Sequence, residues 1–178
     1  MLTCDNAVLV VVDVQGKLAR LMHEAEDLFD RVARLVRGAA VLEVPVIATE
    51  QNPAGLGPTV DEIRPLLPAE AIPKTAFSCC GEAAFVAALE AAGRRQVLLA
   101  GIETHVCVYQ TARDLLARGY EVHVVADAVS SRSVRNRDIG LTKIQAAGAE
   151  VTSVETALFE MLAVAEGPRF KEILKIVK

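Results

Sequence analysis

Three residues in different parts of the chain are candidates for nucleophilic catalysis. Asp13 follows the apolar run 7–12, Lys74 lies in the segment 72–78, and Cys107 follows the apolar run 96–100. A thiol can attack a carbonyl carbon, a carboxylate can move the thiol proton, and an ammonium group can stabilise the charges. Together these residue types could form a cysteine hydrolase.

Cys107 would need activation, because a free thiol with a pKa of about 8.5 is mostly protonated at neutral pH. Thr104 is a good N-cap for a helix over 105–118, which would place Cys107 in the first turn, where unpaired N–H groups and the helix dipole favour a thiolate. Lys74 would stabilise the thiolate further, and Asp13 could accept its proton. We therefore expect a lowered Cys107 pKa if these residues meet.

Each of the three residues also has a purely structural interpretation. Cys107 could be a small buried hydrophobic residue, Asp13 could brace a loop, and Lys74 could be a solvated surface lysine. Residues 107–113 also match the Cys-x5-Arg spacing of cysteine phosphatases. They contain no glycine and fit an uninterrupted helix, which would point Arg113 away from Cys107, so a phosphatase is disfavoured.

The elements that must position these residues alternate along the chain. Short apolar runs predict strands over 7–12, 44–49, 96–100, 121–126 and 149–153. Helical spacing predicts helices over 26–42, 60–67, 82–92, 105–118, 134–147, 155–164 and 170–177, and a loop rich in Gly and Pro over 50–59. This alternation predicts one α/β domain over residues 1–178, with a parallel sheet covered by helices on both faces and a site at the carboxyl ends of its strands.

Composition excludes several classes of function. The 178 residues are 52% hydrophobic and 24% charged, with a net charge of −4, which argues against a nucleic-acid partner. Asp13 interrupts the first apolar run, so we expect no signal peptide or membrane span and a cytoplasmic protein with reduced cysteines. No nucleotide-binding glycine motif occurs and the three histidines are far apart, so neither a cofactor nor a metal is expected.

Several motifs in a fixed order resemble those of the isochorismatase-like cysteine hydrolases, and the closest likeness is to the subgroup called isochorismatase domain-containing proteins. The resemblance spans nearly the whole chain and is carried by residues 13–15, 49–59, 74–78, 101–108 and 126–132. It implies a three-layer α/β sandwich with a central parallel six-stranded sheet. It also implies self-association, since homo-oligomers are common in the family.

The resemblance assigns roles to individual residues. It implies a catalytic triad of Asp13, Lys74 and Cys107, in which Cys107 attacks, Asp13 moves the proton and Lys74 orients the charged pair. It further implies a cis peptide between Ile102 and Glu103, and an oxyanion hole formed by the backbone N–H groups of Glu103 and Cys107. Other residues that could line the pocket are Gln51, with the rest of the loop up to residue 59, Phe77, His105 and Tyr109.

Two departures from the family narrow the function. Nicotinamidases in the family hold a metal with an Asp-x-His pair and a later histidine, whereas no histidine lies between His23 and His105 here. Isochorismatases that cleave a vinyl ether do not need the cysteine that this chain has. We therefore predict a metal-free hydrolase of a small amide or related C–N compound that forms a covalent intermediate on Cys107. The alternative is a non-catalytic interaction protein with the same fold.

Overall fold

The first apolar run forms the central strand of the protein. In a computed structural model, which describes residues 1–68 and 70–178, strand β1 spans Ala7–Val12 and all six of its residues are buried. It pairs in parallel with β2 (Val46–Gln51) on one side and with β4 (Gln96–Ile102) on the other. A strand with neighbours on both edges and helices on both faces has to be apolar throughout, which explains the unbroken run of alanine, valine and leucine.

In the described part of the chain, six parallel strands form one sheet in the order β3-β2-β1-β4-β5-β6. The remaining strands are β3 (Ile72–Lys74), β5 (Glu121–Ser130) and β6 (Glu150–Thr152). The chain builds outward from β1 to β3 and then returns to place β4 on the other side of β1. In such a sheet, ligands bind beyond the carboxyl ends of the strands where the order reverses, which is here between β1 and β4.

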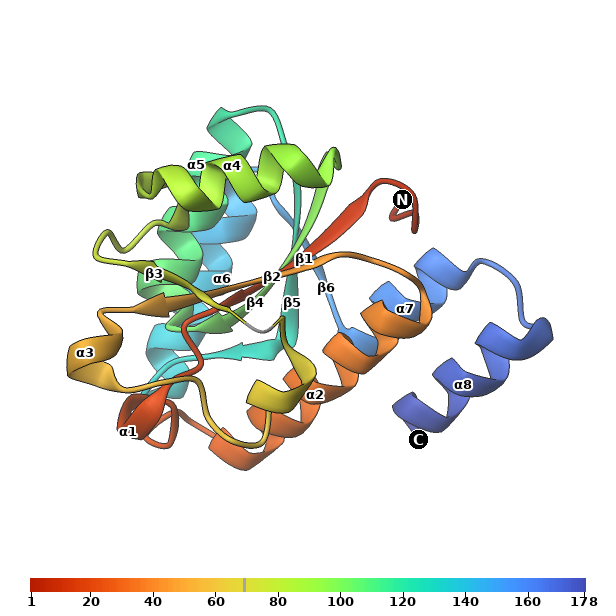
Figure 1. Ribbon diagram of the computed structural model, residues 1–178, viewed down its shortest axis with the longest axis horizontal. Helices are drawn as coiled ribbons and strands as arrows, with labels where there is room; N and C mark the ends of the chain where they lie inside the picture. Colours follow the sequence, from red (N-terminus) through yellow and green to blue (C-terminus); the bar gives the residue numbers. More distant parts are fainter. Residues whose placement is uncertain (69) are drawn as a thin grey trace.

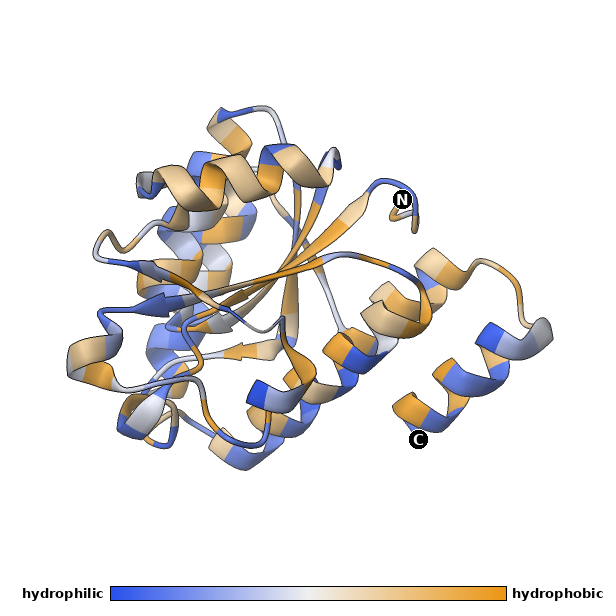
Figure 2. Ribbon diagram, in the orientation of Figure 1, coloured by the Kyte–Doolittle hydropathy of each residue, from blue (hydrophilic) through white to orange (hydrophobic). Residues whose placement is uncertain are grey.

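Helices cover both faces of the sheet, as Figure 1 shows. One face is covered by α2 (Ala25–Val41), α7 (Val154–Leu162) and α8 (Gly167–Val177), and the other by α4 (Ala83–Ala92), α5 (Tyr109–Ala117) and α6 (Val134–Ala146). Alternate residues of β1 belong to two separate apolar cores, one under each helical layer. Figure 2 shows the apolar residues gathered in the strands and on the sides of the helices that face them. The predicted three-layer sandwich with a parallel six-stranded sheet is confirmed.

Several short elements differ from those predicted. The predictions missed β3, as well as the four-residue helices α1 (Gly16–Ala19) and α3 (Pro53–Leu56) and the turn η2 (Cys79–Gly81). Residues 60–67 do not form the predicted helix, but turns that include the three-residue η1 (Arg64–Leu66). Such short segments show no periodicity of their own. For β3, pairing with β2 decides the conformation, and its position at the edge of the sheet tolerates Pro73.

Gly101 lets β4 run unusually close to β1 beside the residue that follows that strand. Its φ angle is +113°, and a Cβ atom added there would lie 2.0 Å from the carbonyl oxygen of Val12. No other residue type fits that space or favours that backbone conformation. Gly101 thus brings the end of β4 next to Asp13.

Candidate active site

The three candidate catalytic residues come together at the carboxyl ends of the strands. Asp13 directly follows β1, Lys74 is the last residue of β3, and Cys107 lies in η3 (Thr104–Val108), the turn after β4. Lys74 Nζ is 2.7 Å from Asp13 Oδ2, and both side chains are almost completely buried. Asp13 has a φ angle of +53°, in the left-handed region that is uncommon for a residue with a side chain. Such conformations cluster at functional sites.

Every donor of the Lys74 ammonium group faces an acceptor inside the protein. Besides the Asp13 carboxylate, Nζ donates to Gln51 Oε1 at 2.6 Å and to the carbonyl oxygens of Ala76 and Phe77 at 3.1 and 3.0 Å. The other carboxylate oxygen, Asp13 Oδ1, accepts a hydrogen bond of 2.8 Å from the Thr49 hydroxyl. The ion pair is therefore fixed on both sides.

Two glutamine side chains hold this arrangement in place. Gln51 Nε2 donates to the carbonyl oxygen of Thr75 at 2.8 Å, so both polar ends of its amide are used. Gln15 accepts from Gln51 N at 2.5 Å and donates to the carbonyl oxygens of Gly57 and Gln51 at 2.7 and 3.2 Å. We call Asp13, Thr49, Lys74, Gln51 and Gln15 the polar network. Gln15 was not among the predicted site residues, although it belongs to the motif 13–15.

Burial, rather than the helix terminus, controls the protonation of the site. Burial raises the pKa of the Asp13 carboxyl, while the charge and hydrogen bond of Lys74 and the hydrogen bond of Thr49 oppose that shift. Burial, followed by the negative charge of Asp13, raises the pKa of the Cys107 thiol to about 12, although Lys74 lowers it. The expected lowering of the Cys107 pKa is therefore wrong. The thiol is therefore protonated at neutral pH, and Lys74 favours the ionised form of the Asp13 carboxyl beside it.

The turn that carries Cys107 is not the first turn of a helix capped by Thr104. Glu103 occupies the N-cap position with extended backbone angles, and its carbonyl oxygen accepts from both Val106 N and Val108 N, at 3.0 and 3.2 Å. The wide turn that results precedes α5, and the peptide bond between Ile102 and Glu103 is cis. The Thr104 hydroxyl is buried and has no hydrogen-bond partner among the described residues. The predicted capping role of Thr104 is therefore wrong.

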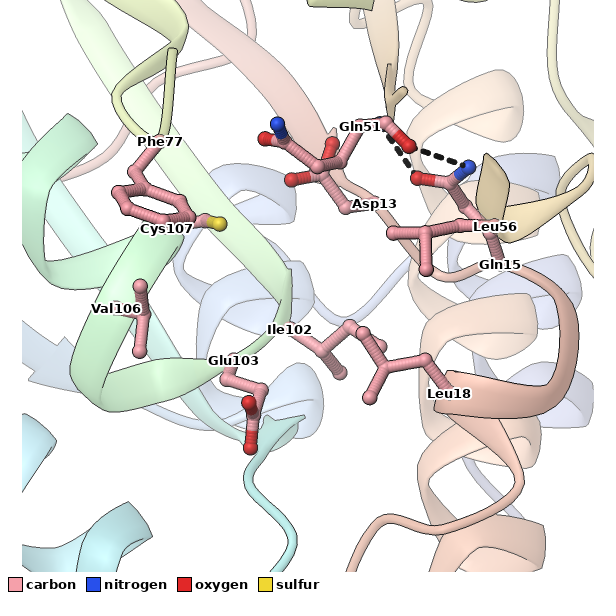
Figure 3. Close-up of a pocket in the computed structure, with 10 residues that line it drawn as sticks. All are labelled: Asp13, Gln15, Leu18, Gln51, Leu56, Phe77, Ile102, Glu103, Val106 and Cys107. Atoms are coloured by element: carbon pink, nitrogen blue, oxygen red, sulfur yellow. Dashed lines mark hydrogen bonds between the residues drawn. The ribbon is translucent and has the colours of Figure 1, made fainter. Parts of the chain in front are cut away.

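A cavity of about 130 Å³ opens beside the Cys107 sulfur (Figure 3). It is lined by five residues that the sequence predicts for the site: Asp13, Gln51, Phe77, Glu103 and Cys107. Its other lining residues are Gln15, Leu18, Leu56, Ile102 and Val106. We call Leu18, Leu56, Phe77 and Val106 the apolar wall.

The apolar wall depends on two short helices that no periodic pattern in the sequence predicts. Leu18 lies in α1 and Leu56 in α3, and these helices are in contact. Gly16 allows this contact: its φ angle is +50°, and an added Cβ atom would lie 1.8 Å from the carbonyl oxygen of Leu56. A glycine three residues after a candidate catalytic aspartate was the available signal, but its meaning depends on α3, which is distant in the sequence.

A family model described as the isochorismatase domain matches residues 7–156. The chain belongs to the isochorismatase family. This confirms the family membership that the motifs predict.

Known members of the isochorismatase family and similar folds support this assignment. Isochorismatase domain-containing protein 1 from Salmo salar is 43% identical over 173 residues, covering 97% of this chain and 61% of the salmon protein. The chain thus spans less than two thirds of that relative. A structure described as MAR1 ribonuclease from Caenorhabditis elegans has a TM-score of 0.92 and 38% identity, covering 99% of this chain and 91% of that one. The YcaC gene product of Escherichia coli, described as an octameric hydrolase of unknown specificity, has a TM-score of 0.92 and 25% identity. The match covers 98% of this chain and 88% of the YcaC chain. These likenesses support a hydrolase fold.

Two residues predicted to line the pocket of this isochorismatase-family site lie outside it. His105 Nδ1 is 3.0 Å from the Ser131 hydroxyl, and the Tyr109 ring lies under Lys143, whose Nζ is 4.7 Å from the ring centre. Neither residue is part of the cavity lining, where Val106 is found instead. The wide turn η3 sets which of these side chains face the cavity. Ordinary helical spacing could therefore not predict their directions.

The other charged groups near the site are paired with neighbours. The Glu103 carboxylate accepts from Arg132 N and Nε at 3.0 and 3.2 Å, and it points away from the Cys107 sulfur (Figure 3). Arg113, the arginine of the phosphatase spacing, is exposed and pairs with its neighbour Asp114 at 3.1 Å. A phosphate bound at Cys107 would therefore not meet Arg113.

Residues 1–68 and 70–178 contain no group of three or more His, Cys, Asp and Glu side chains that could hold a metal ion. Over the same residues, none of the helices combines the length and apolar character needed to cross a bilayer. All four cysteines are free thiols.

Proposed function

We propose that this chain is a cysteine hydrolase that cleaves small amides or related C–N compounds through a covalent intermediate on Cys107. The observation that carries the proposal is the buried Asp13–Lys74 ion pair, whose Asp13 lines the same cavity as Cys107. A buried carboxylate beside a neutral thiol can accept the thiol proton as the sulfur attacks.

The proposed reaction has two steps. In the first, Cys107 Sγ bonds to the amide carbon, Asp13 takes the thiol proton, and the backbone N–H groups of Glu103 and Cys107 stabilise the oxyanion. The C–N bond then breaks and Asp13 gives the proton to the departing nitrogen, which leaves a thioester. In the second step a water molecule attacks the thioester carbon and Asp13 takes a water proton. The C–S bond then breaks, which releases the carboxylic acid, and Asp13 returns that proton to the Cys107 sulfur.

Lys74 acts in this scheme through its charge. Its hydrogen-bond donors are directed at Asp13, Gln51 and backbone carbonyl oxygens, so it holds Asp13 in the anionic form and in position. The scheme needs no group beyond this chain's residues, the substrate and water.

The proposal is tested by trapping the intermediate. The protein is incubated with a panel of small primary amides, ammonia release is measured, and rapidly quenched samples are analysed by peptide mass spectrometry. We expect ammonia release and an acyl adduct on Cys107, and neither in Cys107→Ala. Cys80→Ala, which removes another buried thiol outside the cavity lining, should retain both.

Ammonia release that persists in Cys107→Ala would contradict the proposal. If the intact protein turned over no amide and no related C–N compound, the result would favour the alternative of a non-catalytic interaction protein.

We also propose that the chain forms homo-oligomers. The octameric assembly described for the YcaC gene product supports this, as do the exposed apolar side chains of Val134 and Ile139 on α6. Light scattering coupled to gel filtration should give a mass that is a multiple of the chain mass, and a purely monomeric protein would contradict the proposal.

A further inference from the structure

We propose that the cavity beside Cys107 takes small uncharged amides with an apolar acyl chain and rejects amides whose acyl chain carries a carboxylate or an ammonium group. This inference rests on the proposed function only for the chemistry at Cys107. The selectivity itself follows from what surrounds the cavity.

The polar side chains around the cavity are already engaged with one another. The Lys74 ammonium group has three N–H donors and four acceptors around it: Asp13, Gln51 and the carbonyl oxygens of Ala76 and Phe77. The Gln51 amide donates to Thr75 and accepts from Lys74, so each of its ends already has a partner within the protein.

Gln15 is engaged in the same way. Its amide oxygen accepts from Gln51 N and its amide nitrogen donates to two carbonyl oxygens, those of Gly57 and Gln51. A substrate that displaced one of these contacts would have to break an existing hydrogen bond, and the protein group on its other side would lose its partner.

The charges that line the cavity are also balanced. Asp13 pairs with Lys74, and Glu103 pairs with Arg132 and points away from the sulfur (Figure 3). Among the described residues that line the cavity, none is cationic, so a carboxylate on the substrate would meet no opposite charge. An ammonium group would meet only Asp13 and Glu103, whose charges Lys74 and Arg132 already balance.

The rest of the surface suits an aliphatic chain. The apolar wall, together with Ile102, faces the space beside the sulfur. The cavity volume of about 130 Å³ is close to that of an apolar cavity of about 150 Å³ that holds benzene, which indicates an acyl chain of about five or six carbon atoms. Transfer of an unpaired charge from water into such a space carries a large free-energy cost, whereas transfer of a methyl group does not.

Two pairs of amides of matched shape test the inference. Isocaproamide carries two methyl groups where succinamate carries its two carboxylate oxygens, and valeramide carries a methyl group where γ-aminobutyramide carries its ammonium group. Binding to Cys107→Ala is measured by following the chemical shifts of the protein's backbone N–H groups as each ligand is added. Ammonia release is measured with the intact protein.

We expect each neutral amide to bind Cys107→Ala, and to be hydrolysed by the intact protein, about a hundredfold or more better than its charged counterpart. If a charged amide comes within tenfold of its neutral counterpart, or if isocaproamide does not bind, the inference is overturned. If the neutral amides bind Cys107→Ala with this preference but the intact protein releases no ammonia, the selectivity stands and the proposed cysteine chemistry fails.

Discussion

The polar network and the apolar wall face each other across one cavity, but they are built in opposite ways. Asp13, Thr49 and Lys74 are at most 4% exposed and lie in strands or directly after one. The apolar wall comes from short helices and turns, and Phe77 is 54% exposed. Substitution of one member of a buried ion pair lowers the free energy of unfolding strongly, whereas substitution of a partly exposed side chain on a short helix has a smaller effect. Under the proposed function, the fold thus separates the part that would do the chemistry from the part that would select the ligand.

The largest expected effect comes from the proton acceptor in the polar network. Asp13→Asn keeps the shape of the side chain but cannot take the thiol proton, and it leaves Lys74 without its counterion. We expect kcat for a neutral amide to fall by about 10⁴-fold, comparable to losses in established catalytic triads. Steady-state kinetics of ammonia release measures this. A loss below tenfold would show that another group moves the proton.

The ion pair should also dominate the stability of this region. Lys74→Met leaves the Asp13 carboxylate buried without a partner, and we expect the free energy of unfolding to fall by about 3 kcal/mol. Urea unfolding measures the change. The double variant Asp13→Asn/Lys74→Met should be less destabilised than the sum of its single variants, because it buries no charge. Additive losses would mean that the two groups do not interact.

The raised pKa of Cys107 predicts a smaller effect, a fall in the free energy of unfolding at alkaline pH. The folded thiol has a pKa of about 12, against 9.0 ordinarily, so above pH 9.0 the folded state keeps a proton that the unfolded state releases. The stability that comes from this difference in pKa is fully present below pH 9.0. Above pH 9.0 the free energy of unfolding falls by about 1.4 kcal/mol per pH unit.

The variant Cys107→Ser should remove that slope. Cys79, whose burial raises its pKa to about 11, titrates in both proteins and so cancels in the comparison. Urea unfolding between about pH 9 and pH 10.5 measures the two slopes. Equal slopes would show that the thiol is not buried beside a negative charge.

The smallest effect is expected in the apolar wall. Leu56→Ala removes apolar contact with the acyl chain but leaves the polar network in place. We expect kcat/KM for isocaproamide to fall about threefold to tenfold, and that for acetamide to stay unchanged because its acyl group is too short to reach the wall. Leu21→Ala, which alters a residue 64% exposed and outside the cavity lining, is the matched control. An equal loss for both amides would place Leu56 in the chemistry instead.

The sequence predicts long elements better than short ones. The apolar run of β1 and the helical spacing of α2 are repeated signals, and the structure has both elements within one residue of their predicted bounds. β3 and η3 have three and five residues, and their conformations depend on contacts with β2 and on the carbonyl group of Glu103. Such segments take their structure from neighbours that are distant in the sequence or unusual in geometry.

The same division holds within the candidate site. Residue types alone singled out Asp13, Lys74 and Cys107, since a thiol, a carboxylate and an amine carry recognisable chemistry wherever they stand. Their ordered motifs sufficed to indicate the family and the fold. Tertiary structure decided the direction of the Cys107 pKa shift, because burial outweighs the expected effect of a helix terminus. It also decided which apolar side chains face the ligand, because α1 and α3 meet only once the sheet has brought the ends of β1 and β2 together.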